Sequence, residues 1–259
     1  ADKSKNLNKG GKWRPKYKLS FEELDKFMKY EKIVRATYVD RPNRFIAHAD
    51  LDGRLETVHV KNTGRCKELL IPGRTIILED FRDRAGFESR KTKFDLVAVY
   101  KRPDLLINMD SQAPNKVVME WLKSLEGEEA FDFIKPEYTF GKSRVDFYME
   151  KGNQKFLMEV KGCTLEKDGL GYFPDAPTER GVKHLHELRD AVALGYHCFI
   201  AFVIQVPGVQ EVYPNVETHP EFGQALQEAQ AAGVKVLYLQ CRVEEGELEI
   251  IKNGSCKSE

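Results

Sequence analysis

The sequence predicts a mixed α/β protein in which a small all-β module is followed by an α/β domain. Short apolar segments separated by turn signals fill residues 31–107, and this pattern is typical of a small barrel. After residue 107, helical periodicity alternates with buried strands. The chain has 259 residues, of which 41% are hydrophobic and 32% are charged, so it is long enough for two such units with real cores.

The chain divides into residues 1–30, 31–107 and 108–259. Residues 1–18 carry seven basic side chains and one acid, a net charge of +6 that leaves −6 for the rest of the chain. Such an arm adds non-specific attraction to phosphates, although a solubilising tail or a vector-derived remnant explains it equally. Ser20 and Glu23 form a capping-box pattern, which predicts a short helix over 20–30.

Each predicted strand of the β module is a short run of alternating or β-branched residues that ends at a turn signal. The predicted strands are 32–40, 44–50, 55–60, 74–80 and 93–100. In the second part, apolar residues share one face of a helix predicted over 115–127. The elements predicted after it are strands at 143–150 and 155–164, a helix over 178–194, a strand at 196–206, a helix near 219–232 and a strand at 234–240.

The cysteines and the apolar segments predict a cytoplasmic protein with no membrane partner. The five cysteines are odd in number, far apart and free of any CxxC pair, which argues against a disulfide framework or a zinc knuckle. The longest apolar stretch, 191–206, is interrupted by Gly195 and His197. We interpret it as a helix end that runs into a buried strand rather than as a membrane span. The N-terminal segment lacks the apolar run of a signal peptide.

The strands predicted at 143–150 and 155–164 are joined by Gly152-Asn153, a favoured two-residue hairpin connection. In that register Asp146 lies directly opposite Glu159 on one face of the hairpin. The same face carries two basic side chains, Arg144 and Lys161. The hairpin therefore has one apolar face and one charged face.

Two carboxylates that face each other across a sheet destabilise it unless their pKa values rise or a cation binds between them. Two oxygen ligands with retained water suit Mg²⁺ or Mn²⁺. Lys161 beside such a site could orient the attacking water or stabilise charge on phosphorus. An exposed hairpin face with ion pairs Asp146–Arg144 and Glu159–Lys161 is the structural alternative, and the spacing alone leaves both open.

Asp146 and the Glu159-Val160-Lys161 triplet match the pattern of PD-(D/E)xK nucleases, whose core has the order helix–strand–strand–strand–helix–strand. Four segments resemble the sugar fermentation stimulation protein family more specifically: 60–73 (VKNTGRCKELLIPG), 142–149 (KSRVDFYM), 158–165 (MEVKGCTL) and 169–188 (GLGYFPDAPTERGVKHLHEL). The resemblance covers about residues 31–240. It implies an OB-fold-like module in 31–107 and a PD-(D/E)xK nuclease-like domain in 108–259, with DNA binding and a metal-dependent nuclease activity.

By position, the resemblance makes Asp146 and Glu159 the metal carboxylates and Lys161 the catalytic lysine. In many such nucleases, an acidic side chain from the helix before the hairpin is also part of the metal site. Glu120 is the residue at that position, and a plain surface glutamate is the alternative. The literal Pro-Asp pairs, at 103–104 and 174–175, lie outside the hairpin and are set aside.

Other basic side chains are candidates for phosphate contact. One side of the helix predicted over 178–194 carries Arg180, Lys183 and His184. These side chains could bind phosphate, or Lys183 could assist catalysis. A solvated helix face is the alternative. OB-folds bind single strands through basic grooves and aromatic stacking, although surface arginines are common. The nucleic-acid-binding candidates are Arg44, Lys61, Asn62, Arg65, Arg144, Arg180 and His184.

Two hypotheses follow for the function. The first is a Mg²⁺- or Mn²⁺-dependent nuclease that acts on DNA, with an OB-like binding module in front. The second is a DNA-binding regulator of sugar-utilisation genes whose catalytic residues are vestigial. The presence of Asp146, Glu159 and Lys161 together favours the first, because a binding protein does not need two facing carboxylates. Whether the nucleic acid is single- or double-stranded, whether RNA replaces DNA and whether the protein is a homodimer stay open.

Overall fold

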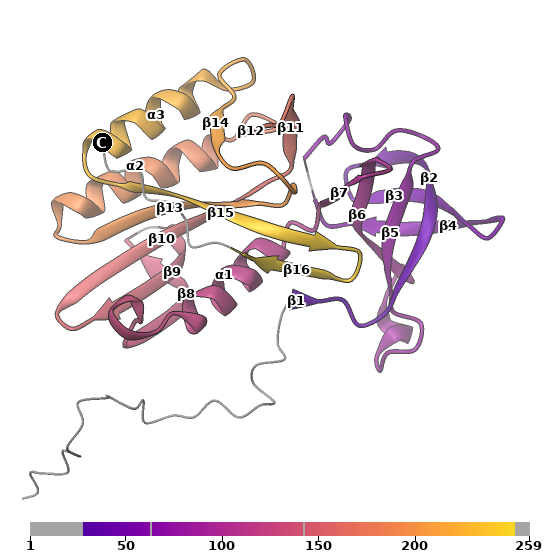
Figure 1. Ribbon diagram of the computed structural model, residues 1–259, viewed down its shortest axis with the longest axis horizontal. Helices are drawn as coiled ribbons and strands as arrows, with labels where there is room; N and C mark the ends of the chain where they lie inside the picture. The colour runs from indigo at the N-terminus through magenta and orange to yellow at the C-terminus, as the bar shows by residue number, and fades with distance from the viewer. Residues whose placement is uncertain (1–27, 63, 142, 252–259) are drawn as a thin grey trace, which may run out of the picture.

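The computed structural model describes residues 28–62, 64–141 and 143–251. They form a β-barrel and an α/β unit, which lie side by side in Figure 1. The predicted basic arm (1–18), residues 20–27 of the predicted N-terminal helix and Cys256 lie outside the described residues. Within the described ranges, no helix has the length and the apolar character needed to cross a membrane.

The barrel consists of β2 (Ile33–Asn43), β3 (Ile46–Leu51), β4 (Arg54–Val60), β5 (Thr75–Asp80) and β6 (Phe94–Arg102). It is closed because β4 pairs with β6 in parallel, in addition to its antiparallel pairing with β3. The turn between β3 and β4 is Asp52-Gly53, with φ of 53° and 78°, as a type I′ hairpin requires. A short 3-10 helix, Phe87–Ser89, precedes β6, and β7 (Leu105–Asn108) follows and pairs with it.

The α/β unit is built on a seven-stranded sheet in the order β1-β16-β15-β13-β10-β9-β8. The three strands β10, β13 and β15 are mutually parallel, and all other pairs are antiparallel. The central strand β13 is an almost continuous apolar run, as expected for a parallel strand covered on both faces. The strands are β1 (Met28–Lys29), β8 (Phe133–Phe140), β9 (Ser143–Lys151), β10 (Gln154–Cys163), β13 (His197–Ile204), β15 (Lys235–Glu244) and β16 (Glu247–Ile250).

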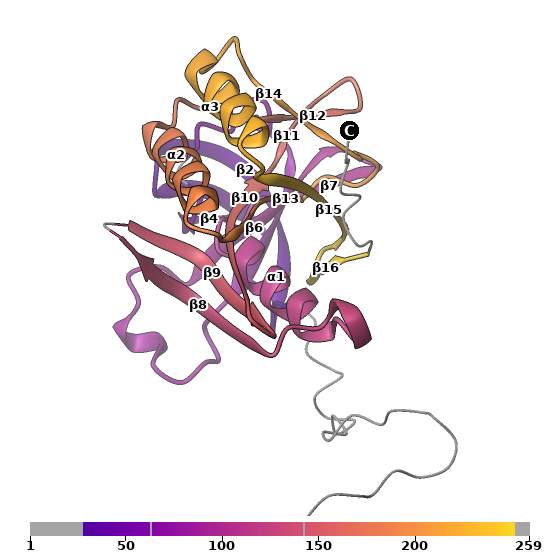
Figure 2. The ribbon, with the colours of Figure 1, turned by 90° about the vertical axis from the view of Figure 1, so that its left-hand side faces the viewer.

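Helix α1 (Ala113–Ser124) covers one face of the sheet, and helices α2 (Glu179–Ala193) and α3 (Pro220–Ala231) cover the other (Figures 1 and 2). Successive residues of β10 alternate between these faces: Leu157 packs in the cluster that contains Leu185, and Met158 packs in the cluster that contains Val118. A small sheet of β11 (Leu165–Lys167), β12 (Leu170–Phe173) and β14 (Val212–Pro214) lies next to the barrel (Figure 1).

The predicted fold class is confirmed, and the differences concern single elements. Residues 28 and 29 are a strand paired with β16 rather than the end of a helix, and Tyr30 is buried, so this segment belongs to the folded unit. Strand β8 was not predicted because its residues are mostly exposed and include Pro136, which is tolerated at the edge of a sheet. The short strands of the small sheet were also not predicted.

Candidate active site

The hairpin of β9 and β10 has the predicted register. Backbone pairing runs from Lys151–Gln154 to Phe147–Met158, and Gly152 has a φ of 57°, as the first central residue of a type II′ turn requires. The next pair differs from the prediction. Asp146 does not continue the ladder opposite Glu159; its carboxylate Oδ2 instead accepts a hydrogen bond from the backbone N–H of Val160 at 2.7 Å.

Glu159 is the most buried charged residue of the hairpin, with 3% of its surface exposed. Its Oε1 accepts a hydrogen bond from Nζ of Lys161 and contacts Nδ1 of His184. Burial opposes ionisation of Glu159, but the hydrogen bond with His184 and the charge of Lys161 outweigh it and lower the pKa. The other oxygen, Oε2, is buried and has no hydrogen-bond partner in the described part of the chain. Glu159 is therefore an ionised carboxylate with one uncommitted oxygen.

Asp146 is held by two donors from different elements. Oδ1 accepts a hydrogen bond from Nδ2 of Asn115, in the first turn of α1, at 2.8 Å, and Oδ2 accepts the bond from Val160. Burial and then the nearby charge of Glu159 raise the pKa of Asp146. The charge of Glu159 thus opposes the ionisation of Asp146, and a cation bound to both carboxylates relieves that repulsion.

His184 enters this cluster from α2. The helix begins after Thr178, whose side chain accepts a hydrogen bond from the N–H of Gly181 at 3.0 Å, and the buried side of the helix then carries His184. Because Nε of Arg180 donates to Nε2 of His184 at 3.3 Å, the ring proton is on Nδ1 and is donated to Glu159. This corrects the expectation that His184 belongs to an exposed stripe.

Two other candidates from the helices are not next to the carboxylates. Lys183 is mostly exposed and lies 3.6 Å from Glu187. Glu120 is in α1, but its Oε2 accepts a hydrogen bond from the backbone N–H of Met28 at 2.9 Å. Burial, with smaller contributions from Glu247 and Glu249, raises the pKa of Glu120 to about 7. The structure thus places Glu120 beside β1 and β16 rather than with Asp146 and Glu159.

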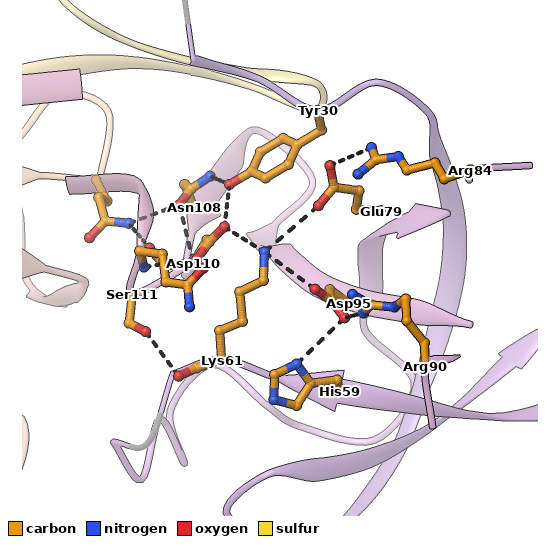
Figure 3. Close-up of polar contacts among 12 residues, drawn as sticks. Tyr30, His59, Lys61, Glu79, Arg84, Arg90, Asp95, Asn108, Asp110 and Ser111 are labelled. Atoms are coloured by element: carbon orange, nitrogen blue, oxygen red, sulfur yellow. Dashed lines mark hydrogen bonds and ion pairs between the residues drawn. The ribbon is translucent and has the colours of Figure 1, made fainter. Parts of the chain in front are cut away.

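Lys61 is enclosed by acidic side chains instead of lying on a nucleic-acid surface. Its Nζ lies 3.1 Å from Asp110, 3.4 Å from Asp95 and 3.7 Å from Glu79 (Figure 3), and only 10% of the side chain is exposed. Burial lowers the pKa of Lys61, but these carboxylates outweigh it and the net shift is upward. The ammonium group is therefore committed to ion pairs and is not available to a phosphate.

The remaining basic candidates are on the surface. Arg44 is exposed and its guanidinium lies 4.9 Å from the centre of the Phe45 ring. Arg65 and Arg180 are also exposed, and the exposed Arg144 lies 3.4 Å from Glu137. Asn62 is half-buried, and its Oδ1 accepts a hydrogen bond from the N–H of Gly64 at 2.8 Å.

The carboxylate pair is chemically suited to a divalent cation. Among residues 28–62, 64–141 and 143–251, no group of three or more His, Cys, Asp and Glu side chains is arranged to hold a metal ion. Mg²⁺ nevertheless binds through one or two carboxylates and keeps several waters. The buried, unpartnered Oε2 of Glu159, next to the carboxylate of Asp146, fits that mode of binding.

Sequence reasoning identified Asp146, Glu159 and Lys161 but missed two residues that hold them. Asn115 was not considered, although its place in the first turn of the helix before the hairpin was visible. His184 was assigned to nucleic acid rather than to Glu159. Both contacts depend on how α1 and α2 pack against the sheet, which a single sequence does not reveal.

Comparison with known proteins covers both units. Residues 39–109 match the model of the SfsA N-terminal OB domain, and residues 112–247 match that of the sugar fermentation stimulation protein RE domain. A sugar fermentation stimulation protein homolog from Desulfitobacterium hafniense is 53% identical over 222 residues, which is 86% of this chain and 95% of the relative. A homolog from Clostridium beijerinckii is 50% identical over 225 residues, with 86% and 96% covered.

A solved structure extends this likeness to three dimensions. The structure of Pyrococcus furiosus SfsA in complex with Ca²⁺ is 28% identical in sequence and has a TM-score of 0.75. It covers 88% of this chain and 97% of the other chain. Both units of the present structure are therefore included in the comparison.

Proposed function

The chain belongs to the sugar fermentation stimulation protein family, and we propose that it is a divalent-metal-dependent nuclease of the PD-(D/E)xK type that acts on DNA. The observation that carries the proposal is the state of Glu159. Its carboxylate is buried and ionised, one oxygen is committed to Lys161 and His184, and the other has no partner within the described residues. A buried charged oxygen without a partner is costly, and a bound cation removes that cost.

Asp146 and Glu159 are the residues that would hold the metal ion, and when bound it supplies an activated water and stabilises charge on the phosphate. The Ca²⁺ complex of the Pyrococcus furiosus relative supports this choice of group, since Ca²⁺ and Mg²⁺ both prefer oxygen ligands. Mg²⁺ or Mn²⁺ suits two carboxylates with additional water ligands.

The protein's own groups position the reaction. Asn115 and the N–H of Val160 fix the carboxylate of Asp146, while His184 fixes that of Glu159. Lys161 is half-buried beside the same carboxylate. Its ammonium group can orient the attacking water or stabilise the developing charge on the phosphoryl oxygens.

The barrel supplies a surface for the nucleic acid. OB-folds bind single strands through basic grooves and stacked aromatic rings, and the exposed Arg44 and Phe45 lie together on the barrel. Arg65, on the loop after β4, is exposed as well. DNA is the proposed partner, and RNA is tested in the same experiment.

The test is incubation of the purified protein with single-stranded, double-stranded and branched DNA and with RNA, in Mg²⁺, in Mn²⁺ and in a chelator. We expect cleavage that requires the cation and is lost in Asp146→Asn and in Lys161→Ala. Lys155→Ala is the matched control, because Lys155 is an exposed lysine on the same strand as Lys161. Cleavage that persists in the chelator, or in Asp146→Asn, would refute the proposed chemistry.

One observation favours a second candidate. Within the described residues, Asp146 and Glu159 are not joined by a third side chain that could complete a metal site. Such an incomplete site is what a protein that has lost catalysis would have. The alternative is therefore a DNA-binding regulator of sugar-utilisation genes that does not cut DNA. Salt-sensitive DNA binding without cleavage in any of the cations would favour this alternative.

A further inference from the structure

A pocket of about 120 Å³ lies between the barrel and the α/β unit. Its lining includes Gly162 near the end of β10 and Gln205 just after β13. These two parallel strands end at the same edge of the sheet, and the crevice outside the carboxyl ends of parallel strands is a common ligand site. The loop after β4 contributes Asn62 from the barrel side. No residue of this pocket takes part in the contacts of the carboxylate pair described above.

The pocket is immediately next to the candidate active site. Gly162 follows Lys161, and Pro114 of the lining precedes Asn115, the residue that holds Asp146. Adjacent Cα atoms are about 3.8 Å apart. The pocket and the carboxylate pair are therefore built on neighbouring residues of the same two elements, β10 and α1.

Two glycines allow close packing at the pocket and beside it. A Cβ on Gly162 would lie 2.4 Å from Oε1 of Gln205, and a Cβ on Gly64 would lie 2.1 Å from Oδ2 of Asp175. The loop that carries Gly64 is fixed from the barrel, because the guanidinium of Arg41 donates to the carbonyl oxygens of Asn62 and Gly64. The absence of a Cβ at these positions, together with the fixed loop, thus allows the two units to approach each other closely at this point.

The polar groups of the pocket select an uncharged ligand with N–H donors. Asp175 has no ion-pair partner in the described part of the chain, and burial raises the pKa of its carboxyl group. Gln205 is 1% exposed, and its Nε2 is committed to Asn108 and Asp110. Among the described residues neither lysine nor arginine lines the pocket, so a phosphate would meet a carboxylate without a compensating cation.

The lining also includes Tyr172, Phe173, Ser111 and Thr164. The ring of Phe173 packs against Phe202 and Phe222, and the hydroxyl group of Ser111 donates to the carbonyl oxygen of Lys61. A small heterocycle with N–H donors along one edge matches a pocket of this size that carries a carboxylate and no cation, and a nucleobase has that chemistry.

We propose that this pocket binds one nucleobase, unstacked from its strand, next to the nucleotide whose phosphate lies at Asp146 and Glu159. The inference rests on the proposed nuclease function and specifies its substrate. A base in an intact duplex is stacked and paired and must be extruded before it can enter such a pocket. The preferred substrate is therefore single-stranded DNA or DNA with an unpaired base.

The test is an abasic scan. A fluorescent single-stranded hexanucleotide is bound to the full chain in Ca²⁺ and, in parallel, in EDTA, and one abasic residue is moved through its six positions. Loss of a stacked, hydrogen-bonded base costs about tenfold or more in Kd. We expect that loss in wild type at one internal position, and a much smaller loss at that position in Asp175→Asn. Asp104→Asn is the matched control, because Asp104 follows the other Pro-Asp pair and its side chain is 80% exposed.

The outcomes separate the two proposals. If binding is tight and salt-sensitive but the abasic residue has the same effect on Kd at every position, the base pocket is overturned and the nuclease proposal stands. Equal affinity for the single strand and for the annealed duplex has the same meaning. Failure of every oligonucleotide to bind overturns both. If Asp175→Asn does not fold, the isosteric Thr164→Val carries the same comparison, and an unchanged abasic profile in Thr164→Val counts against the pocket.

Discussion

The ammonium group of Lys61 lies 3.1 Å from the carboxylate of Asp110 and connects the barrel to the segment that leads into α1. The same carboxylate accepts a hydrogen bond from the hydroxyl group of Tyr30 at 3.3 Å (Figure 3). Asn108 donates to that hydroxyl group at 2.9 Å. One buried lysine thus links the barrel, the N-terminal segment and the α/β unit.

Replacement of Lys61 by Met should destabilise the protein by about 3–5 kcal/mol, because it removes the ion pair of the buried Asp110, whereas Glu79 and Asp95 keep their ion pairs with Arg84 and Arg90. Urea unfolding of wild type and variant at pH 7 measures the change. Lys67→Met is the control, since Lys67 is exposed on the same loop, and it should change the free energy of unfolding by less than about 0.5 kcal/mol. Equal stability of the two variants would contradict a structural role for Lys61.

The carboxylate pair should bind divalent cations in the folded state only. At a concentration a hundredfold above Kd, Mn²⁺ should raise the free energy of unfolding by about 2.7 kcal/mol. Asp146→Asn and Glu159→Gln should lose most of this gain. Without metal, Asp146→Asn should be at least as stable as wild type, because the pKa of Asp146 is raised, whereas Glu159→Gln should be less stable, because the charge of Glu159 is stabilised by Lys161 and His184. Lys161→Ala should keep the gain and lose cleavage. Thermal melts with and without Mn²⁺ check this, and an equal shift in wild type and Glu159→Gln would exclude the pair as the metal site.

His184 should act by positioning Glu159. Residues that orient metal ligands typically contribute 10–100-fold in metal affinity or activity, so His184→Ala should weaken Mn²⁺ binding by roughly that factor in titration calorimetry. DNA binding measured without metal should not change. His186→Ala is the matched control, because His186 is two residues away and its side chain is 42% exposed. Weaker DNA binding with unchanged metal affinity would instead return His184 to a phosphate-contacting role.

Much of the fold was predictable because its signals are local. Gly152-Asn153 sets the register of the β9–β10 hairpin, and Gly195 ends α2 after a clear apolar stripe. β8 lacks such a signal, since Pro136 and the exposed residues around it are typical of a loop. β1 is a two-residue strand that exists only because β16, over 200 residues later, pairs with it.

In the candidate site, too, some residues are predictable from local sequence signals and others depend on tertiary packing. Asp146, Glu159 and Lys161 lie on one hairpin, and strand alternation alone places them near one another. The contact of Glu159 with His184 needs the packing of α2 on the sheet. Lys61 was misplaced on the surface because its enclosure depends on the pairing of β4 with β6, which brings Asp95 beside it.

Glu120 gives a prediction of pH dependence. Its pKa is raised from 4.5 to about 7, mainly by burial. Between these values the folded state binds more protons than the unfolded state, so the free energy of unfolding should fall as pH rises from about 4.5 to 7. Glu120→Gln keeps an acceptor for the N–H of Met28 and removes the titration. The variant should therefore gain stability relative to wild type across this range, with a constant difference above it.

Urea midpoints at pH 5 and pH 8 measure this effect. Glu126→Gln, an exposed glutamate just after the same helix, should follow wild type at both pH values. A midpoint difference between Glu120→Gln and wild type that is the same at pH 5 and pH 8 would show that Glu120 does not titrate between them. If Mn²⁺ stabilises wild type but not Glu120→Gln, then Glu120 belongs to the metal site, as the resemblance to PD-(D/E)xK nucleases implies, and its contact with Met28 must break when the cation binds.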